Sequence, residues 1–434
     1  MTFKKKIVTC MASAMAMAVL LAGCGNSNNE QTATSEPQVT EAAEDKAEET
    51  AAPTTETAAE DEIQNKDAST MSLKEAYKDL FDIGVAVNSW QLADKKVLAR
   101  ITKDYSTFTC ENEMKPDYLL DHNASMEAKD GMPVLTTEKL DEILTMAEDA
   151  GLKMRGHTLV WHSQTPEWLF REGYDDGKDY VDKDTMLKRM ESYIKKVITY
   201  CQEKHPGVVY AWDVVNEYLH RGRAWSLNWT SVYGDMKGTP SYVKRAFERA
   251  YEMLEKYDAT DKVTLFYNDY DTYFEVEDLL ALVNFINEGE KAKICSGIGM
   301  QSHVDVKRPT IEEYGAALEK FMAAGYEVQI TELDFTINFD TDGTDKKDPS
   351  YDYKNEGETI EEQAAFVKDF MEMVIAKQKN RDKTVSPKGI TGLTIWGLYD
   401  SISWRGKSQP LLFGTSIDDP KPAFQAFLEA SRTK

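Results

Sequence analysis

The feature that most constrains the fold is a regular alternation of short apolar runs with longer amphipathic stretches, from about residue 72 onward. The apolar runs have the length and β-branched content of buried strands, and the stretches between them have the spacing of helices with one apolar face. Eight runs recur in this way. They span residues 81–87, 107–110, 152–160, 208–215, 263–267, 297–301, 327–333 and 390–396.

Eight strand–helix units in succession predict an α/β fold, a single (β/α)8 TIM barrel over residues 72–434. An open doubly wound sheet is the alternative. Its dinucleotide-binding form is not supported, because no Gly-rich phosphate loop follows the first predicted strand.

Three of the helical stretches have recognisable ends. One spans residues 137–150 and is followed by a glycine. Thr239 and Pro240 predict the N-cap and first residue of a second helix. A third opens with Thr310 and closes before Gly325, and the glutamate three residues after Thr310 completes a capping box.

The first 71 residues differ from the rest in composition. Three lysines at 4–6 precede an apolar run that is too short for a comfortable membrane span, as in a secretory signal. The run ends Leu-Ala-Gly-Cys24, which resembles the lipobox of bacterial lipoproteins. We expect a lipoprotein signal peptide over 1–23, a lipid anchor on Cys24 and a disordered acidic linker over 24–71. This predicts a protein anchored to the membrane at the bacterial cell surface. An ordinary signal peptide with a chance cysteine is the alternative.

Charge limits the partners of the chain. Lys and Arg number 51 against 75 Asp and Glu, a net charge of −24, and residues 25–69 alone carry 12 acidic and 2 basic residues. A surface of this sign repels nucleic acid and anionic membranes, so we expect no nucleic acid partner and membrane contact through the lipid anchor alone. Neutral substrates suffer no such repulsion. We expect a monomer, with Cys110, Cys201 and Cys295 as buried unpaired thiols.

Polar and aromatic residues gather where the predicted strands end, which is the edge of a barrel that carries active sites. The run Trp-Asp-Val-Val-Asn216-Glu217 ends in a carboxylate, and Glu332 follows another apolar run. Two strand-end carboxylates on separate strands are the groups that cleavage of a glycosidic bond requires. The other candidates are Glu111, Asn112, Lys115, His157, Trp161, Gln164, Tyr270, Gln301, His303, Asp334, Trp396 and Trp404.

Other chemistries fit these residues less well. His157 and His162 are five positions apart, which puts them on opposite faces of a strand, and no His-Glu-x-x-His helix accompanies them. We therefore expect no metal and no cofactor. Lys115 is the one candidate for Schiff-base chemistry, and we expect its neighbouring carboxylates to keep it charged.

Six motifs together resemble glycoside hydrolase family 10, in order and over residues 72 to about 430. They lie at residues 111–115, 156–162, 212–217, 297–303, 331–334 and 396–398. The resemblance implies a retaining endo-1,4-β-xylanase that acts on xylan and xylo-oligosaccharides, with Glu217 as general acid/base and Glu332 as nucleophile. It implies supporting roles for Asn216, His303 and Asp334, and substrate binding by Glu111, Asn112, Lys115, His157, Trp161, Gln164, Tyr270, Gln301, Trp396 and Trp404.

Two departures from the family pattern are visible. Asp271 stands where the family commonly has Asn, which weakens the assignment of contacts on the leaving-group side of the cleaved bond. The loop before Trp404 has Ser where Gly is usual. Two other functions stay open from the sequence: a related barrel β-glucanase, and a lipoprotein that binds oligosaccharides without catalysis.

Overall fold

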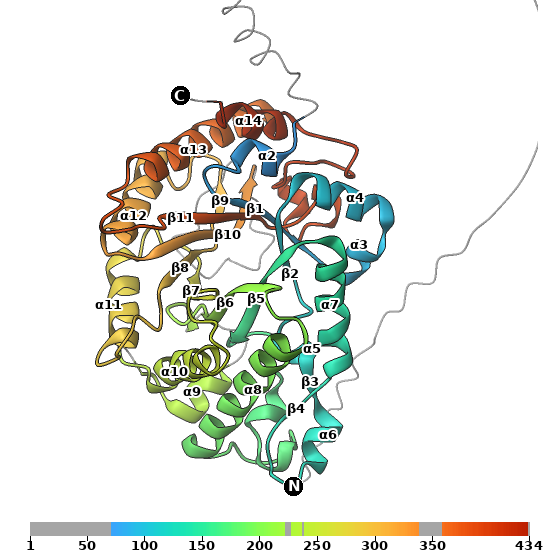
Figure 1. The fold of residues 1–434 in the computed structure, drawn as a ribbon, viewed down its shortest axis with the longest axis vertical. Coiled ribbons are helices and arrows are strands. Elements are labelled where there is room, and N and C mark those ends of the chain that lie inside the picture. The colour runs from blue at the N-terminus through green and yellow to red at the C-terminus, as the bar shows by residue number, and fades with distance from the viewer. Residues whose placement is uncertain (1–70, 222–226, 237, 338–357, 433–434) are drawn as a thin grey trace, which may run out of the picture. The chain divides into compact units, whose positions relative to one another are not determined.

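The computed structural model describes residues 71–221, 227–236, 238–337 and 358–432. In these residues eight parallel strands form a closed barrel (Figure 1), because the last strand pairs with both the first strand and the one before it. Closure contradicts the open-sheet alternative. The strands are β1 Asp82–Val87, β2 Thr107–Cys110, β5 Lys153–Val160, β6 Val209–Asn216, β7 Thr264–Asp269, β8 Gly297–Met300, β10 Glu327–Thr336 and β11 Ile390–Ile395. All eight predicted strands are confirmed.

Each barrel strand is followed by a helix on the outside of the barrel (Figure 1). In strand order these helices are α4 Lys95–Asp104, α7 Thr137–Ala150, α8 Lys183–Lys204, α10 Ser241–Lys256, α11 Val276–Asn287, α12 Ile311–Ala323, α13 Ile360–Asn380 and α14 Pro422–Ala430. Shorter elements fill the connections: α2 Leu73–Tyr77, α3 Ser89–Ala93, α5 Pro116–Leu119, β3 Leu120–Asp121, α6 His122–Glu127, β4 Val134–Leu135, α9 Asn228–Tyr233 and β9 His303–Asp305, with 3-10 turns at Glu167–Phe170, Glu172–Tyr174, Asp400–Ile402 and Gly406–Ser408.

Two of the three predicted helix ends are confirmed. Helix α7 ends before Gly151, whose φ of 64° is the left-handed conformation that glycine adopts easily. Helix α12 begins after Thr310, whose hydroxyl and backbone complete the predicted capping box. The third prediction was wrong by one residue. Pro240 is the N-cap of α10 and not its first residue, because its ψ of 100° is extended.

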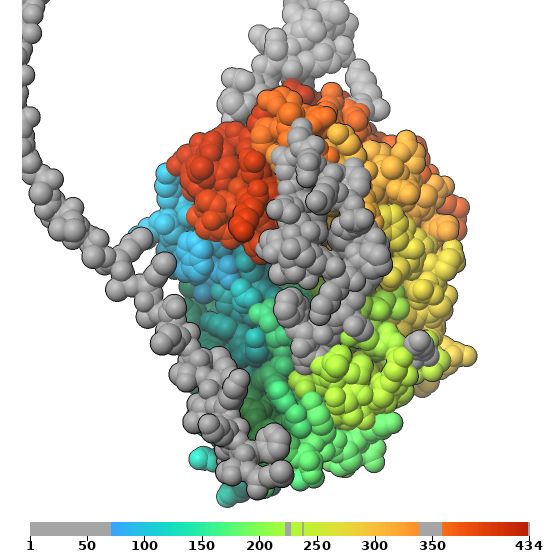
Figure 2. Space-filling model, turned by 180° about the vertical axis from the view of Figure 1, so that it is seen from behind, coloured from blue at the N-terminus to red at the C-terminus, as the bar shows by residue number. Residues whose placement is uncertain are grey.

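The two ends of the described chain meet on the barrel wall. The hydroxyl of Tyr77 in α2 donates to the carbonyl of Phe427 in α14, and the Arg100 guanidinium lies 4.5 Å from the ring centroid of Phe413. Figure 2 shows the blue surface of the first described residues beside the red surface of the last ones. These contacts fix α2 against α14, and α4 against the segment that follows β11.

The three cysteines of the barrel are buried free thiols, as the sequence predicts. Burial raises the pKa of Cys201 and of Cys295 to about 12. Such thiols stay protonated and behave as small apolar side chains. Within the described residues no helix combines the length and apolarity needed to span a bilayer. The predicted signal, the anchor at Cys24 and almost all of the linker lie outside the described residues.

Candidate active site

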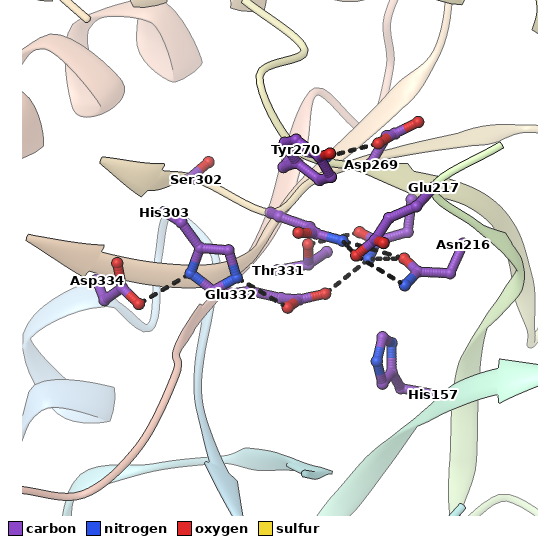
Figure 3. Close-up of polar contacts among 12 residues, drawn as sticks. His157, Asn216, Glu217, Asp269, Tyr270, Ser302, His303, Thr331, Glu332 and Asp334 are labelled. Carbon is purple, nitrogen blue, oxygen red and sulfur yellow. Dashed lines mark hydrogen bonds and ion pairs between the residues drawn. The ribbon is translucent and has the colours of Figure 1, made fainter. Parts of the chain in front are cut away.

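The predicted site residues converge at the carboxyl ends of the strands, and Figure 3 shows Glu217 and Glu332 facing a shared space. Glu217 follows the last residue of β6, while Glu332 lies within β10. The backbone of Glu217 has φ of 57°, a left-handed conformation that is uncommon for a side chain of this size. A hydrogen bond of 2.9 Å from its N–H to the carbonyl of Asn268 holds it there. This strained turn directs the Glu217 carboxylate into the barrel mouth.

Glu217 is held by neutral donors. Trp161 Nε1 donates to one carboxylate oxygen at 2.8 Å, and Gln301 Nε2 donates to the other at 2.9 Å. His162 Nε2 lies 3.5 Å from the same carboxylate, but burial lowers the pKa of His162 to about 4 and leaves that ring neutral at neutral pH. No full positive charge therefore compensates Glu217 in these contacts. Burial, helped by the negative charge of Asp269, raises the pKa of Glu217 to about 7, although the Gln301 hydrogen bond acts in the opposite direction.

Glu332 is in a different environment. His303 Nε2 lies 3.1 Å from one of its oxygens, and His303 Nδ1 lies 2.8 Å from Asp334, so the ring joins the two carboxylates (Figure 3). Burial acts to raise the pKa of Glu332, but the His303 hydrogen bond and nearby imidazole charge outweigh it and the pKa is lowered. Burial also opposes charging of His303, yet Asp334 and Glu332 raise its pKa to about 9. Glu332 is thus an ionised carboxylate beside an imidazolium.

An amide network connects the two carboxylates. Asn268 Nδ2 donates to Glu332 at 2.8 Å and to Asn216 Oδ1 at 2.8 Å, and Gln301 Nε2 lies 3.2 Å from the same Asn216 oxygen. Thr331 Oγ1 donates to Asn268 Oδ1 at 2.6 Å, which fixes which end of the Asn268 amide faces Glu332. The network holds both carboxylates and the Asn216 amide in one rigid arrangement.

Asn268 is a functional residue for which no role was predicted from the sequence. Its side chain fits because the neighbouring strand has no side chain at Gly299. A Cβ there would lie 2.3 Å from Asn268 Oδ1. A glycine beside a polar strand-end residue on the neighbouring strand was the available signal, and it needs the strand pairing to be seen.

A fully buried ion pair under the site was also missed. Arg155 in β5 donates two hydrogen bonds of 2.7 Å to Asp213 in β6 and a third of 2.7 Å to Gln329. Asp213 accepts a further bond of 2.9 Å from His157 Nδ1. A carboxylate can only accept here, so His157 carries a proton on Nδ1. Opposite charges at Arg155 and Asp213, inside two apolar runs of neighbouring strands, were the sequence signal.

Polar side chains continue from the carboxylates toward the rim. Lys115 Nζ donates to Gln164 at 2.6 Å, Gln164 Nε2 donates to Asn112 at 2.9 Å, and Lys115 Nζ lies 4.9 Å from the ring centroid of Trp161. Our expectation for Lys115 was incomplete: Glu332 and Glu217 do favour its charge, but burial is the larger effect and its pKa is lowered. Burial also raises the pKa of Glu111 in the same region.

The aromatic candidates fall into two groups. Trp404 is 62% exposed, with its ring centroid 5.0 Å from that of His303, so one side of the indole is open to a ligand. Trp396 is only 8% exposed and packs edge-on against His157, at 5.4 Å between centroids. Tyr270 stacks on His220 at 3.7 Å. Trp396 therefore forms a wall beside the histidines, while Trp404 offers free area.

Carboxylates and imidazoles in this site pair with each other or with amides. Nowhere in residues 71–221, 227–236, 238–337 and 358–432 do three or more His, Cys, Asp or Glu side chains meet in an arrangement that could hold a metal ion. The geometry instead presents one carboxyl with a raised pKa and one with a lowered pKa across a shared space. Two such groups are an acid and an anion available at the same pH.

Comparison with known proteins identifies the family. The model of "Glycosyl hydrolase family 10" matches residues 72–430. This chain belongs to glycosyl hydrolase family 10. Endo-1,4-beta-xylanase A of Butyrivibrio fibrisolvens is 38% identical over 365 residues, which cover 80% of this chain and 81% of the relative. Endo-1,4-beta-xylanase B of the same organism is 36% identical, covering 83% of this chain and 53% of the relative.

Solved structures of the family share the fold. The endo-1,4-beta-D-xylanase 10B of Clostridium thermocellum, solved as CBM22-1 and GH10 modules with xylohexaose, has a TM-score of 0.68 and 30% identity, covering 84% of this chain and 67% of that one. The intracellular xylanase TsXylA of Thermoanaerobacterium saccharolyticum, solved as a mutant with xylotriose, has a TM-score of 0.65 and 30% identity, covering 84% and 99%. The family 10 barrel is therefore shared across these chains.

Proposed function

We infer that this family 10 barrel is an endo-1,4-β-xylanase that hydrolyses internal xylosidic bonds of xylan with retention of anomeric configuration. The observation that carries the assignment of roles is the opposite shift of two carboxyl pKa values. Glu217 is raised to about 7 and Glu332 is lowered. A carboxyl that holds its proton near neutrality suits a general acid, and an ionised carboxylate suits a nucleophile.

In the first step the Glu332 carboxylate attacks the anomeric carbon while Glu217 gives its proton to the departing glycosidic oxygen. One C–O bond forms to the enzyme and one breaks to the leaving chain. In the second step ionised Glu217 takes a proton from water, and that water attacks the same carbon and releases Glu332. Two inversions at one carbon give net retention.

The surrounding residues bind and orient the sugar in this proposal. The Asn216 amide, fixed by Asn268, is placed to bond the sugar 2-hydroxyl, a contact that strengthens in the transition state. The pyranose ring lies between Trp404 and the wall formed by Trp396 and His157. The remaining binding residues are Glu111, Asn112, Lys115, Trp161, Gln164, Tyr270 and Gln301. A family structure solved with xylohexaose supports an extended xylo-oligosaccharide as ligand.

The function is tested by product release from three polymers side by side: xylan, arabinoxylan and carboxymethyl cellulose. We expect reducing ends to appear from both xylans in the form of short oligosaccharides, which marks internal cleavage. Release mainly from carboxymethyl cellulose would identify a β-glucanase instead. Absence of release from all three, with retained binding to xylo-oligosaccharides, would identify a binding protein.

The pKa values predict how activity responds to pH. Proton donation by Glu217 requires its protonated form, so kcat/KM on xylan should fall as pH rises through about 7. Attack by Glu332 requires its ionised form, whose pKa is lowered, so activity should persist below the usual range of a glutamate. A pH profile of kcat/KM measures both limbs.

Asp269→Asn tests the cause of the alkaline limb. The Asp269 charge helps to raise the pKa of Glu217, so its neutral replacement should move that limb to lower pH. Asparagine keeps the size of the side chain, and a thermal melt checks that the fold is kept. An alkaline limb that stays in place, or moves to higher pH, would contradict the contribution of Asp269 to the raised pKa of Glu217.

For the N-terminal segment we propose a lipid anchor on Cys24, a signal peptide over residues 1–23 and an acidic linker from there to residue 71. The support is the basic start, the short apolar run and the small residues before Cys24. The barrel would then act outside the cell, tethered to the membrane as a monomer. Cys24→Ala is expected to move the protein from the membrane fraction to the medium, measured by fractionation with an activity assay. Retention of that variant at the membrane would reject the anchor.

A further inference from the structure

A short helix beyond the predicted binding residues carries an exposed tryptophan. Helix α3 follows β1 at the active-site edge of the barrel, and Trp90 within it is 54% exposed. Its neighbours Gln91 and Leu92 are buried. The backbone N–H of Ser89 donates to the buried Glu113, and the Asn88 N–H donates to Gln91 at 2.7 Å. The helix is therefore fixed on the barrel, and it holds one large ring outward.

Hydrogen bonds connect this helix to the site. Asn88, the N-cap of α3, accepts a bond of 3.0 Å from Asn112 Nδ2. The same side chain of Asn112 accepts from Gln164, which in turn binds Lys115. Burial raises the pKa of Glu111, and a hydrogen bond from Asn88 opposes that rise in part. Asn88 thus contacts the outermost members of the proposed binding set, and the helix that it caps carries the exposed Trp90.

We propose that Trp90 is the stacking platform of an additional subsite, which takes a third xylosyl residue on the non-reducing side of the cleaved bond. This rests on the proposed function, in which Glu111, Asn112 and Lys115 hold the second sugar on that side. A xylan chain that leaves this second position passes over α3. There it meets the flat apolar face of Trp90 and the polar Asn88, which is the pairing that a pyranose ring uses.

The competing explanation is that Trp90 is an isolated exposed aromatic with no ligand. Single exposed apolar residues are common on protein surfaces. The rigid anchoring of α3 and its bonds to the binding set favour the subsite. The two explanations predict different dependence on substrate length, because a subsite contributes only when the substrate reaches it.

The test uses nitrophenyl β-glycosides of xylobiose and xylotriose, in which release of nitrophenol reports one cleavage position. The quantity compared is kcat/KM on the xylotrioside divided by kcat/KM on the xylobioside. We expect Trp90→Ala to lower this ratio about three- to tenfold, the range of a lost stacking contact. Trp90→Phe should restore part of it. Phe274→Ala is the matched control, because this aromatic is 48% exposed but lies in the loop after β7, and it should leave the ratio at the parental value.

Three results would overturn the proposal, and they are distinguishable. An unchanged ratio in Trp90→Ala with an active parent would reject the subsite alone. A fall of equal size on both substrates, with a lowered melting temperature, would show that Trp90 is structural. A parent protein that cleaves neither xyloside would reject the function and the subsite together.

Discussion

Glu332→Ala is expected to lose about 10⁴-fold or more in kcat/KM on xylan and on aryl xylobiosides alike. The loss is independent of the leaving group because no covalent bond to the sugar can form without this carboxylate. Glu332 is buried and bonded to Asn268 and His303, so its removal also takes one hydrogen-bond acceptor away from each of these side chains. Circular dichroism of the variant separates that structural cost from the chemical one.

Glu332→Gln is the matched control for this prediction. The amide keeps the size of the side chain and can still contact Asn268, but it cannot attack the anomeric carbon. It should therefore fold like the parent and remain as inactive as Glu332→Ala on both substrates. Near-normal turnover by either variant would contradict the assignment of Glu332 as the nucleophile.

Glu217→Ala is expected to separate the two steps of the reaction. Xylan has a poor leaving group that needs protonation, so its cleavage should slow by about 10²–10⁴-fold, the usual contribution of a general acid/base. The acidic phenol of an activated aryl xylobioside departs with little protonation. The glycosyl-enzyme should therefore form readily and then hydrolyse slowly. Rapid mixing should show a burst of phenol equal to the enzyme concentration, followed by a slow steady state.

The contrast between substrates is what identifies Glu217. A variant that lost activity equally on xylan and on the activated aryl xylobioside, without a burst, would have lost something other than the acid/base. The control is Asn216→Ala. This residue belongs to the amide network between the carboxylates. Its loss should lower kcat/KM on both substrates by a similar factor, because it removes a sugar contact and not a proton donor.

The strands and the strand-end residues could be predicted because both signals are local. A β-branched run such as 208–215 identifies a buried strand, and parallel strands of a closed barrel bring their carboxyl ends together. The convergence of Glu217, which follows β6, with Glu332 in β10 is expected from that rule alone. The family resemblance then supplied the roles, which no spacing along the sequence could assign.

The parts that were missed depend on contacts between strands. His157 and Asp213 are direct partners in the register between β5 and β6, and this pairing brings Arg155 to the same carboxylate. The position of the Asn268 side chain depends on the absence of a side chain at Gly299 in the neighbouring strand.

The start of α10 was misplaced because Pro240 can be the first helical residue or the cap, and only its backbone angles decide.

The lowered pKa of Lys115 could also not be predicted from the sequence. Its neighbouring carboxylates were visible as motifs, but the depth at which the side chain is buried was not. The same holds for Trp396, which the sequence could not distinguish from the exposed Trp404. Burial is a property of the whole fold, so it sets pKa values and free aromatic area only once the barrel has closed.

In the proposed reaction Glu332 forms a covalent bond to the sugar while Glu217 supplies the proton. It is tested most directly by trapping that bond with a xylobioside that carries fluorine at C2 and an activated leaving group, which slows the second step more than the first. Peptide mapping by mass spectrometry should find one fluoroxylobiosyl group per chain, attached to Glu332. A label on any other residue, or hydrolysis of xylan by a protein that forms no adduct and inverts the anomeric centre, would contradict this mechanism.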